Sequence, residues 1–204
     1  MSRGKKQTFR EDILEATRKL FTECGYNNVS LRDIAAELGI SVGNLAYYYK
    51  SKLELIEAAI LDKHGHTAPF VPATTLQEVD ALLIQTEKVQ RQHLYYFRQY
   101  SQLSAISPTI RELQANMSDS NERILITTLE NLQNEGLMMP PWYAGQYEDL
   151  IAALLFMLTR WHEQEELNSV LERETPDFRK AVWGILTPLL TEKGRTEWKK
   201  LQNH

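Results

Sequence analysis

Cysteine is almost absent from this chain of 204 residues: Cys24 stands alone, so no disulfide can form within the chain. Proline and glycine are few, and alternating apolar and polar runs between turn signals, the pattern of β-strands, are missing. The longest apolar run, Leu150 to Leu158, is about half as long as a membrane-spanning helix requires. These shortages exclude disulfide-stapled, β-rich and membrane-spanning classes. They predict an all-α protein, long enough to bury a core without a metal or disulfide staple.

A large net charge is missing too, since the total is -4. Its distribution is uneven: residues 1–52 hold nine Lys or Arg against six Asp or Glu, and residues 53–204 hold fourteen against twenty-one. The first ten residues contain four basic side chains and no acidic one, which indicates either an arm for a polyanion or a solvated chain start. This start has no apolar segment of the secretory kind, so we expect a reducing, cytoplasmic location.

Helix start and stop signals recur along the chain. Four helices are predicted in the N-terminal part, beginning near residues 8, 30, 41 and 51 and ending near residues 25, 39, 49 and 63. Residues 67–75 hold two prolines and no charge, which indicates a linker or a loop. Further helices are predicted over residues 75–100, 120–134, 147–167 and 176–193.

Two of the short predicted helices are joined by Gly39-Ile40-Ser41. A sharp turn between helices favours Gly at a position with positive φ, and Ala35 is a small residue where the two helices would cross. The spacing is typical of a helix-turn-helix, but it also occurs in helical hairpins of other all-α proteins.

Three consecutive tyrosines follow at residues 47–49. Helical geometry turns Tyr49, with Leu45, toward the core and leaves Tyr47 and Tyr48 to other faces. An exposed phenol beside lysines suits the phosphate oxygens of DNA, and helix N-termini at Ser30 and Ser41 offer backbone N–H donors to the same anions. The alternative is that Tyr47 or Tyr48 packs against a neighbouring helix.

The segments ILEATRKLFTECGYNNVSL, IAAELGIS and GNLAYYYKSKLEL resemble the DNA-binding domain of the TetR/AcrR family of bacterial transcriptional regulators. The resemblance covers the first 55 to 60 residues. It implies a three-helix DNA-binding domain with a helix-turn-helix over residues 1–52, and a larger all-α effector-binding and dimerisation domain over residues 53–204. It also implies a one-component homodimeric regulator, usually a repressor, that a small molecule releases from a palindromic operator in double-stranded DNA.

Carried over by position, the resemblance places Arg32 at a base edge or a phosphate. It places Val42, Gly43 and Asn44 near base edges, and Tyr48 and Lys52 at phosphates. Ala46 departs from the family, which usually has a tyrosine there, and Tyr47 is expected to take over part of that role. Together with the residues themselves, the resemblance predicts this DNA-binding set: Ser30, Arg32, Ser41, Val42, Gly43, Asn44, Tyr47, Tyr48 and Lys52.

The last predicted helices carry apolar surfaces wider than one neighbour needs, and the resemblance implies that they pair with a second copy in a four-helix bundle. The predicted interface residues are Leu150, Leu154, Leu158, Val182, Ile185 and Leu189. The alternative is an ordinary core helix in a monomer.

An effector pocket is expected among aromatic and soft side chains, although such stripes are more often plain core. The candidates are His93, Tyr96, Phe97, Tyr100, Phe156, Met157 and Trp161. Neither a CxxC nor an HExxH spacing occurs, so no metal site and no cofactor is predicted.

Two other classes stay open. An all-helical enzyme would need a nucleophile, and Cys24 has no evident histidine partner. A protein-interaction module would agree with the acidic C-terminal part, and it would not retard DNA.

Overall fold

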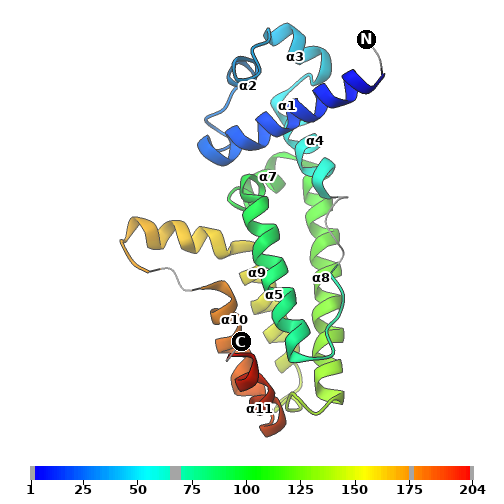
Figure 1. Ribbon diagram of the computed structural model, residues 1–204, viewed down its shortest axis with the longest axis vertical. Coiled ribbons are helices and arrows are strands. Elements are labelled where there is room, and N and C mark those ends of the chain that lie inside the picture. Colours follow the sequence, from blue (N-terminus) through cyan, green and yellow to red (C-terminus); the bar gives the residue numbers. More distant parts are fainter. Residues whose placement is uncertain (1–2, 65–69, 175–176, 203–204) are drawn as a thin grey trace. The chain divides into compact units, whose positions relative to one another are not determined.

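The computed structural model describes residues 3–64, 70–174 and 177–202, with the side chains of residues 3–6, 63 and 64 outside the description. Every element of two or more residues in these ranges is a helix, which confirms the predicted all-α class (Figure 1). The chain forms two compact units. Unit 1 combines residues 1–68 with residues 93–114, and unit 2 combines residues 69–92 with residues 115–204.

Unit 1 is built around the first helix, α1, which packs against α2, α4 and α6. Its helices are α1 (Arg3–Cys24), α2 (Leu31–Glu37), α3 (Val42–Tyr48), α4 (Lys52–His64), α6 (Leu94–Phe97), α7 (Tyr100–Ile106) and the start of α8 (Pro108–Asn134). Its centre consists of fully buried side chains, among them Ile13, Phe21, Ile34, Leu45, Leu55, Ile56 and Tyr95. The segment after residue 92 therefore belongs to the same packed body as the first four helices.

Unit 2 contains α5 (Leu76–Gln92), the rest of α8, α9 (Gln146–Val170), α10 (Phe178–Leu186), a 3-10 turn (Thr187–Leu189) and α11 (Glu192–Leu201). Helix α5 packs on α10 and α11. Leucines and other apolar side chains from all these helices share one core, which includes Leu76, Leu83, Leu132, Ile151, Leu154, Phe178 and Trp183.

Three of the predicted helices have wrong bounds. The helix expected over residues 120–134 already begins at Pro108, a residue that is tolerated in the first turn of a helix. The helix expected over residues 75–100 ends at Gln92, and His93 has a non-helical backbone, with φ -119° and ψ 34°. The three aromatic residues that follow, 95–97, are buried in unit 1 whereas α5 is buried in unit 2, so the chain turns between them. The helix expected over residues 176–193 breaks near Pro188, since proline lacks the N–H of a helix interior, and Thr191 caps a new helix.

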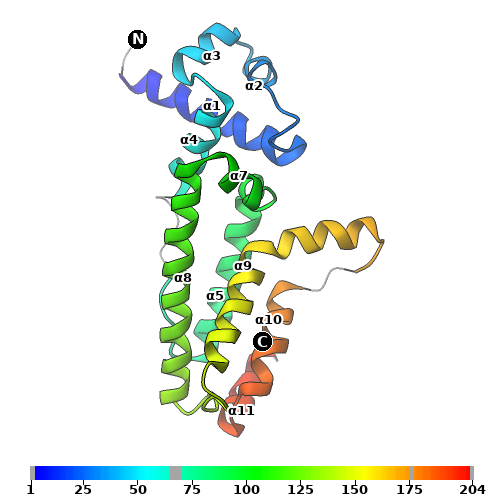
Figure 2. The same cartoon turned by 180° about the vertical axis from the view of Figure 1, so that it is seen from behind.

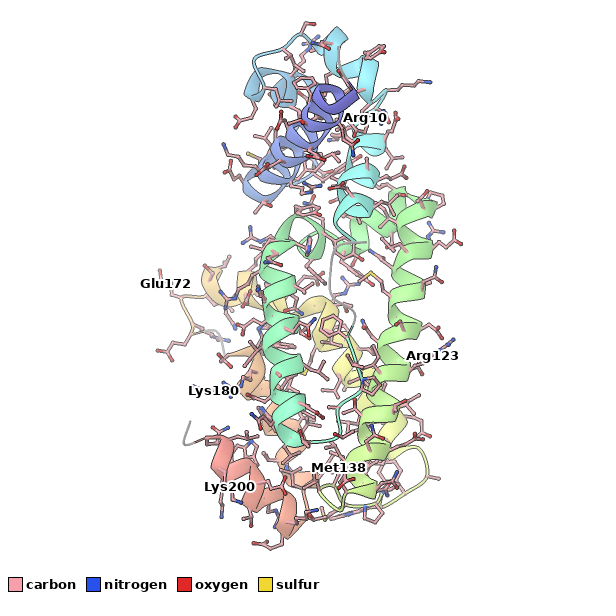
Figure 3. The ribbon with its side chains drawn as sticks, turned by 45° about the vertical axis from the view of Figure 1, so that its right-hand side comes forward. Arg10, Arg123, Met138, Glu172, Lys180 and Lys200 are labelled. Atoms are coloured by element: carbon pink, nitrogen blue, oxygen red, sulfur yellow. The ribbon has the colours of Figure 1, made fainter. Side chains whose placement is uncertain are left out.

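Helix α9 bends sharply along its length, and its C-terminal part leads outward to Glu172 (Figures 1, 2 and 3). Two of its backbone carbonyl oxygens accept hydrogen bonds from side chains. The Thr159 hydroxyl donates to Leu155 O at 3.1 Å, and the buried amide of Gln90 donates to Leu158 O at 2.7 Å. Both contacts are known causes of helix bending, because they draw a carbonyl away from the helical ladder.

Candidate nucleic-acid interface

Helices α2 and α3 are joined by a turn that needs glycine. Gly39 has φ +65°, in the left-handed region, and Ile40 N–H donates back to Ala35 O at 2.9 Å. Ala35 is 1% exposed, which confirms it as the small residue where the two helices approach. The predicted helix-turn-helix is therefore present, with both helices seven residues long.

The N-terminus of α2 is closed by its own side chains. The Ser30 hydroxyl accepts from Asp33 N–H at 3.3 Å, and the Asp33 carboxylate accepts from Ser30 N–H at 2.7 Å. The Ser30 hydroxyl also donates to the same carboxylate at 2.6 Å, and this hydrogen bond, followed by that from Ser30 N–H, lowers the pKa of Asp33 below its ordinary value. The predicted anion-binding end of α2 thus carries a carboxylate of its own, and Ser30 acts there as a cap.

Helix α3 presents one open face. Ser41 caps it by accepting from Asn44 N–H at 3.1 Å, and Leu45, which is 0% exposed, anchors its inner side. The outer residues are Val42, Gly43, Asn44, Ala46 and Tyr47, all of them exposed. This face offers a methyl surface, one amide and one phenol, which are groups that contact base edges and phosphates.

The three tyrosines have three different surroundings. Tyr49 is buried, which confirms its predicted place in the core, whereas Tyr47 is 70% exposed. Tyr48 is half-buried and lies edge-on against the ring of Phe9, with the centroids 5.4 Å apart. Tyr48 is therefore the tyrosine that packs on a neighbouring helix, and its contact with Phe9 could not be predicted from local spacing because the two residues are 39 positions apart.

Arginines lie at the edges of this region. Arg32 is exposed on α2, and Arg10, also exposed, projects from α1 with its guanidinium 6.0 Å from the centre of the Tyr49 ring (Figure 3). An open cleft nearby is lined by Gln7, Arg10, Glu11, Leu14, Tyr47, Tyr48, Tyr49 and Asp62. The predicted basic arm rests mainly on residues 3–6, whose side chains lie outside the described residues.

Lys52 points into the protein. Its ammonium donates to Tyr26 O at 2.7 Å and to Val29 O at 2.9 Å, and it lies 4.2 Å from the centre of the Tyr26 ring. Burial lowers its pKa below the ordinary value. Two of the three donors of this ammonium are thus held by the loop between α1 and α2, and the predicted phosphate contact stays a prediction for the third.

The predicted effector residues fall into two groups. Those in unit 1 form an aromatic cluster in which the rings of Tyr96 and Phe97 are 5.1 Å apart and those of Tyr96 and Tyr100 5.4 Å apart. Tyr96 is 5% exposed, and burial raises its pKa far above the ordinary value. His93 is half-buried beside this cluster.

The other three predicted effector residues belong to unit 2. Phe156 is 67% exposed on α9, while Met157 and Trp161 pack partly against the core. The Trp161 ring lies edge-on to that of Phe178, with the centroids 5.5 Å apart. The seven residues predicted for the effector pocket are therefore divided between the two units.

Three of the six predicted dimer residues belong to the core of a single chain. Leu150, Leu154 and Val182 are 8%, 5% and 3% exposed, so they have little surface left for a partner. The helical period marked them as apolar, but it could not separate the inner face of α9 and α10 from an outer one. Leu158 and Leu189 are half-buried and Ile185 is 37% exposed.

In the parts of the chain that the structure describes, no helix has the length and apolar character needed to cross a membrane. Among the same residues, no group of three or more His, Cys, Asp or Glu side chains is arranged to hold a metal ion.

Comparisons with known proteins agree with this site. Residues 13–59 match the family model of bacterial regulatory proteins, tetR family. The chain is 23% identical over 177 residues to the probable HTH-type transcriptional regulator YttP of Bacillus subtilis (strain 168), covering 74% of this chain and 84% of YttP. A crystal structure of a TetR-family regulator from Marinobacter aquaeolei VT8 superposes with a TM-score of 0.80 at 20% identity, covering 95% of this chain and 97% of that one.

A second solved structure has the same fold. It is a putative transcriptional regulator from Saccharomonospora viridis in complex with choline, with a TM-score of 0.72, 20% identity, and coverage of 91% of this chain and all of that chain. The family model lies on the helix-turn-helix and its supporting helices, and the structural matches extend over nearly the whole chain. Residues 13–59 are thus a DNA-binding domain of the tetR family, and the chain as a whole has the fold of TetR-family transcriptional regulators.

Proposed function

We propose that this protein is a cytoplasmic, homodimeric repressor of the TetR family that binds a palindromic operator and is released from it by a small molecule. The observation that carries the proposal is the exposed face of α3. Leu45 on this helix and Tyr49 directly after it are buried, and they hold α3 against the other helices of unit 1. The family assignment removes the enzyme alternative, because TetR family regulators are not enzymes.

For DNA reading, we propose that α3 enters the major groove. Asn44 is its one exposed amide, suited to a base edge, while Val42 and Gly43 can contribute only methyl contact and close backbone approach. Tyr47 and Arg32 are exposed and suit phosphates, and Tyr48 can reach a phosphate only with the part of its side chain that Phe9 leaves open.

We place the DNA-binding domain in residues 1–52 and the effector-binding and dimerisation domain in residues 53–204. The packing of unit 1 supports the first part, since α1, α2 and α3 contact one another there, and it adds α4, α6 and α7 to the same body. Helix α4 would then be the element that carries an effector signal to α3, by shifting the spacing of the two DNA-reading heads in the dimer.

For the dimer, we propose the outer faces of α9 and α10. Ala152, Ala153 and Phe156 are exposed on α9, and Gly184 and Ile185 are exposed on α10. Small residues allow helices to approach closely, and an exposed phenylalanine beside them is the kind of anchor that interfaces bury. Two recognition helices related by a two-fold axis would read half-sites about 34 Å apart or a multiple of that distance.

The effector is proposed to be small and largely apolar or aromatic, because the candidate residues are aromatic and soft side chains. The Saccharomonospora viridis relative was solved with choline, which supports small-molecule binding by this fold and says nothing about which molecule this chain takes. A coupling free energy of about 1.4 kcal/mol between effector and DNA would give a tenfold release.

The experiment that tests the proposal is selection of bound fragments from random duplex DNA at two salt concentrations. We expect enrichment of a palindrome and, if each protomer neutralises about four phosphates, a slope of log K against log salt of roughly -7. Enrichment of a single half-site would contradict the dimer. A slope near zero, or no enrichment at low salt, would contradict the DNA-reading face and favour a protein-interaction module.

A further inference from the structure

The peptide group of Tyr26, in the loop between α1 and α2, is held from both sides. Its N–H donates a short hydrogen bond to the side-chain oxygen of Gln99, across 73 residues, and its carbonyl accepts from Lys52 at 2.7 Å. The Tyr26 ring packs against Phe21, with the centroids 5.5 Å apart, and lies under the Lys52 ammonium. Both ends of this peptide are therefore tied to side chains that come later in the sequence.

Gln99 is suited to this place because an amide both accepts and donates. Its oxygen takes the Tyr26 N–H, while its nitrogen donates to Tyr95 O at 3.0 Å and to Phe21 O at 3.4 Å. The residue stands between α6 and α7 and is half-buried. One side chain thus joins residues 93–114 to both the end of α1 and the loop that follows it.

Lys52 extends this set of hydrogen bonds from Tyr26 to Val29. The same ammonium that binds Tyr26 O also binds Val29 O at 2.9 Å. Val29 is 3% exposed and immediately precedes Ser30, the cap from which α2 begins. Because both carbonyls accept from one ammonium, Lys52 constrains the separation of residues 26 and 29, directly before the Ser30 cap of α2.

We propose that Gln99, Tyr26 and Lys52 form a chain of hydrogen bonds through which residues 93–114 position α2, and that Lys52 acts mainly as a positioning residue within it. The route goes beyond the effector signal proposed for α4, because it reaches the helix-turn-helix through the loop before α2. It consists only of groups of the protein itself, so it can be tested on DNA affinity alone.

The test is a double-mutant cycle on affinity for the selected DNA, using Gln99→Met, Lys52→Met and the double variant. We expect each single variant to raise the Kd about tenfold, and the double variant to raise it no more than the worse single one, since both break the same chain. The slope of log K against log salt should stay unchanged in all three, because no phosphate contact is lost. Gln102→Met is the matched control: it lies one turn away on α7 with an exposed hydrogen bond to Asn27, and its Kd should change less than twofold.

Two results would overturn the proposal. If Lys52→Met makes the salt slope of the dimer shallower by about 2, one phosphate per protomer, and its effect multiplies with that of Gln99→Met, Lys52 is a phosphate contact that acts independently of Gln99. A second measurement needs no variant: amide hydrogen exchange in the wild-type protein. The Tyr26 amide should be protected although it lies in a loop, and exchange of this amide at the rate of an open loop would refute the chain.

Discussion

Arg179 binds Asp80 through two parallel hydrogen bonds, from Nε to Oδ1 at 2.5 Å and from Nη2 to Oδ2 at 2.8 Å. The Asp80 carboxylate also accepts from the indole N–H of Trp183 at 2.9 Å. The three groups join α5 to α10 across about a hundred residues of sequence, and Asp80 is the one acceptor that serves both donors. Removing this carboxylate would take away the acceptor of these hydrogen bonds from the Arg179 guanidinium and from the buried indole N–H of Trp183.

We therefore expect Asp80→Ala to lower the free energy of unfolding by about 2 to 3 kcal/mol, less than for a fully buried pair because Arg179 is 36% exposed. Chemical denaturation followed by circular dichroism measures this. The control is Asp119→Ala, which breaks a pair with Arg123 whose two side chains are both more than half exposed, and it should change stability by less than about 0.5 kcal/mol. Equal effects of the two variants would contradict a structural role for Asp80.

The capping box of α2 should make stability depend on pH in acid. The pKa of Asp33 is lowered in the folded protein, so its ionised form stabilises the fold, fully above the ordinary pKa of 3.8 and progressively less as pH falls through the lower folded value. We expect Asp33→Asn to lower the Tm at pH 7, with the difference from wild type shrinking below about pH 4. Thermal unfolding between pH 2.5 and 7 measures it, and a difference independent of pH would show that the charge of Asp33 contributes nothing.

Two substitutions on the exposed face of α3 should distinguish a residue that reads the base sequence from one that binds phosphate. Asn44→Ala should cost about 1 to 3 kcal/mol on the preferred operator and reduce discrimination at one base-pair position. Tyr47→Phe removes only a hydroxyl, so it should weaken binding to all sequences alike, by about 1 kcal/mol. Binding to a panel of operators with single base-pair changes measures both. Loss of discrimination in Tyr47→Phe, or its retention in Asn44→Ala, would reverse the two assignments.

The proposed dimer interface places Phe156 between two protomers. Burying a phenylalanine contributes about 2 kcal/mol, and the two-fold axis counts it twice, so Phe156→Glu should raise the dimer Kd roughly a thousandfold. Light scattering on purified protein at micromolar concentration should then give a monomer. Trp142→Glu replaces an aromatic that is even more exposed, in the loop before α9, and should leave the dimer intact. Dissociation by Trp142→Glu alone would move the interface to that loop.

The helix-turn-helix could be read from the sequence because its determinants are local. The Ser30 cap, Gly39 and the buried Leu45 lie within one short segment of sequence, so the spacing located the turn, and the family resemblance separated a helix-turn-helix from other helical hairpins. The same reasoning identified Tyr49 as a core residue. It could not separate Tyr47 from Tyr48, since the ring that covers Tyr48 belongs to Phe9 on another helix.

Only the tertiary structure decided which apolar faces turn inward and which polar side chains hold distant segments. Helical period marked Leu150, Leu154 and Ile185 alike as interface residues, but packing buried the first two and left the third exposed. A lysine after a recognition helix suggested a phosphate contact, and the fold instead turned Lys52 toward two carbonyls of a loop more than twenty residues earlier. Local propensity specifies helices, caps and turns, whereas the partner of a long side chain depends on which distant backbone the fold brings within its reach.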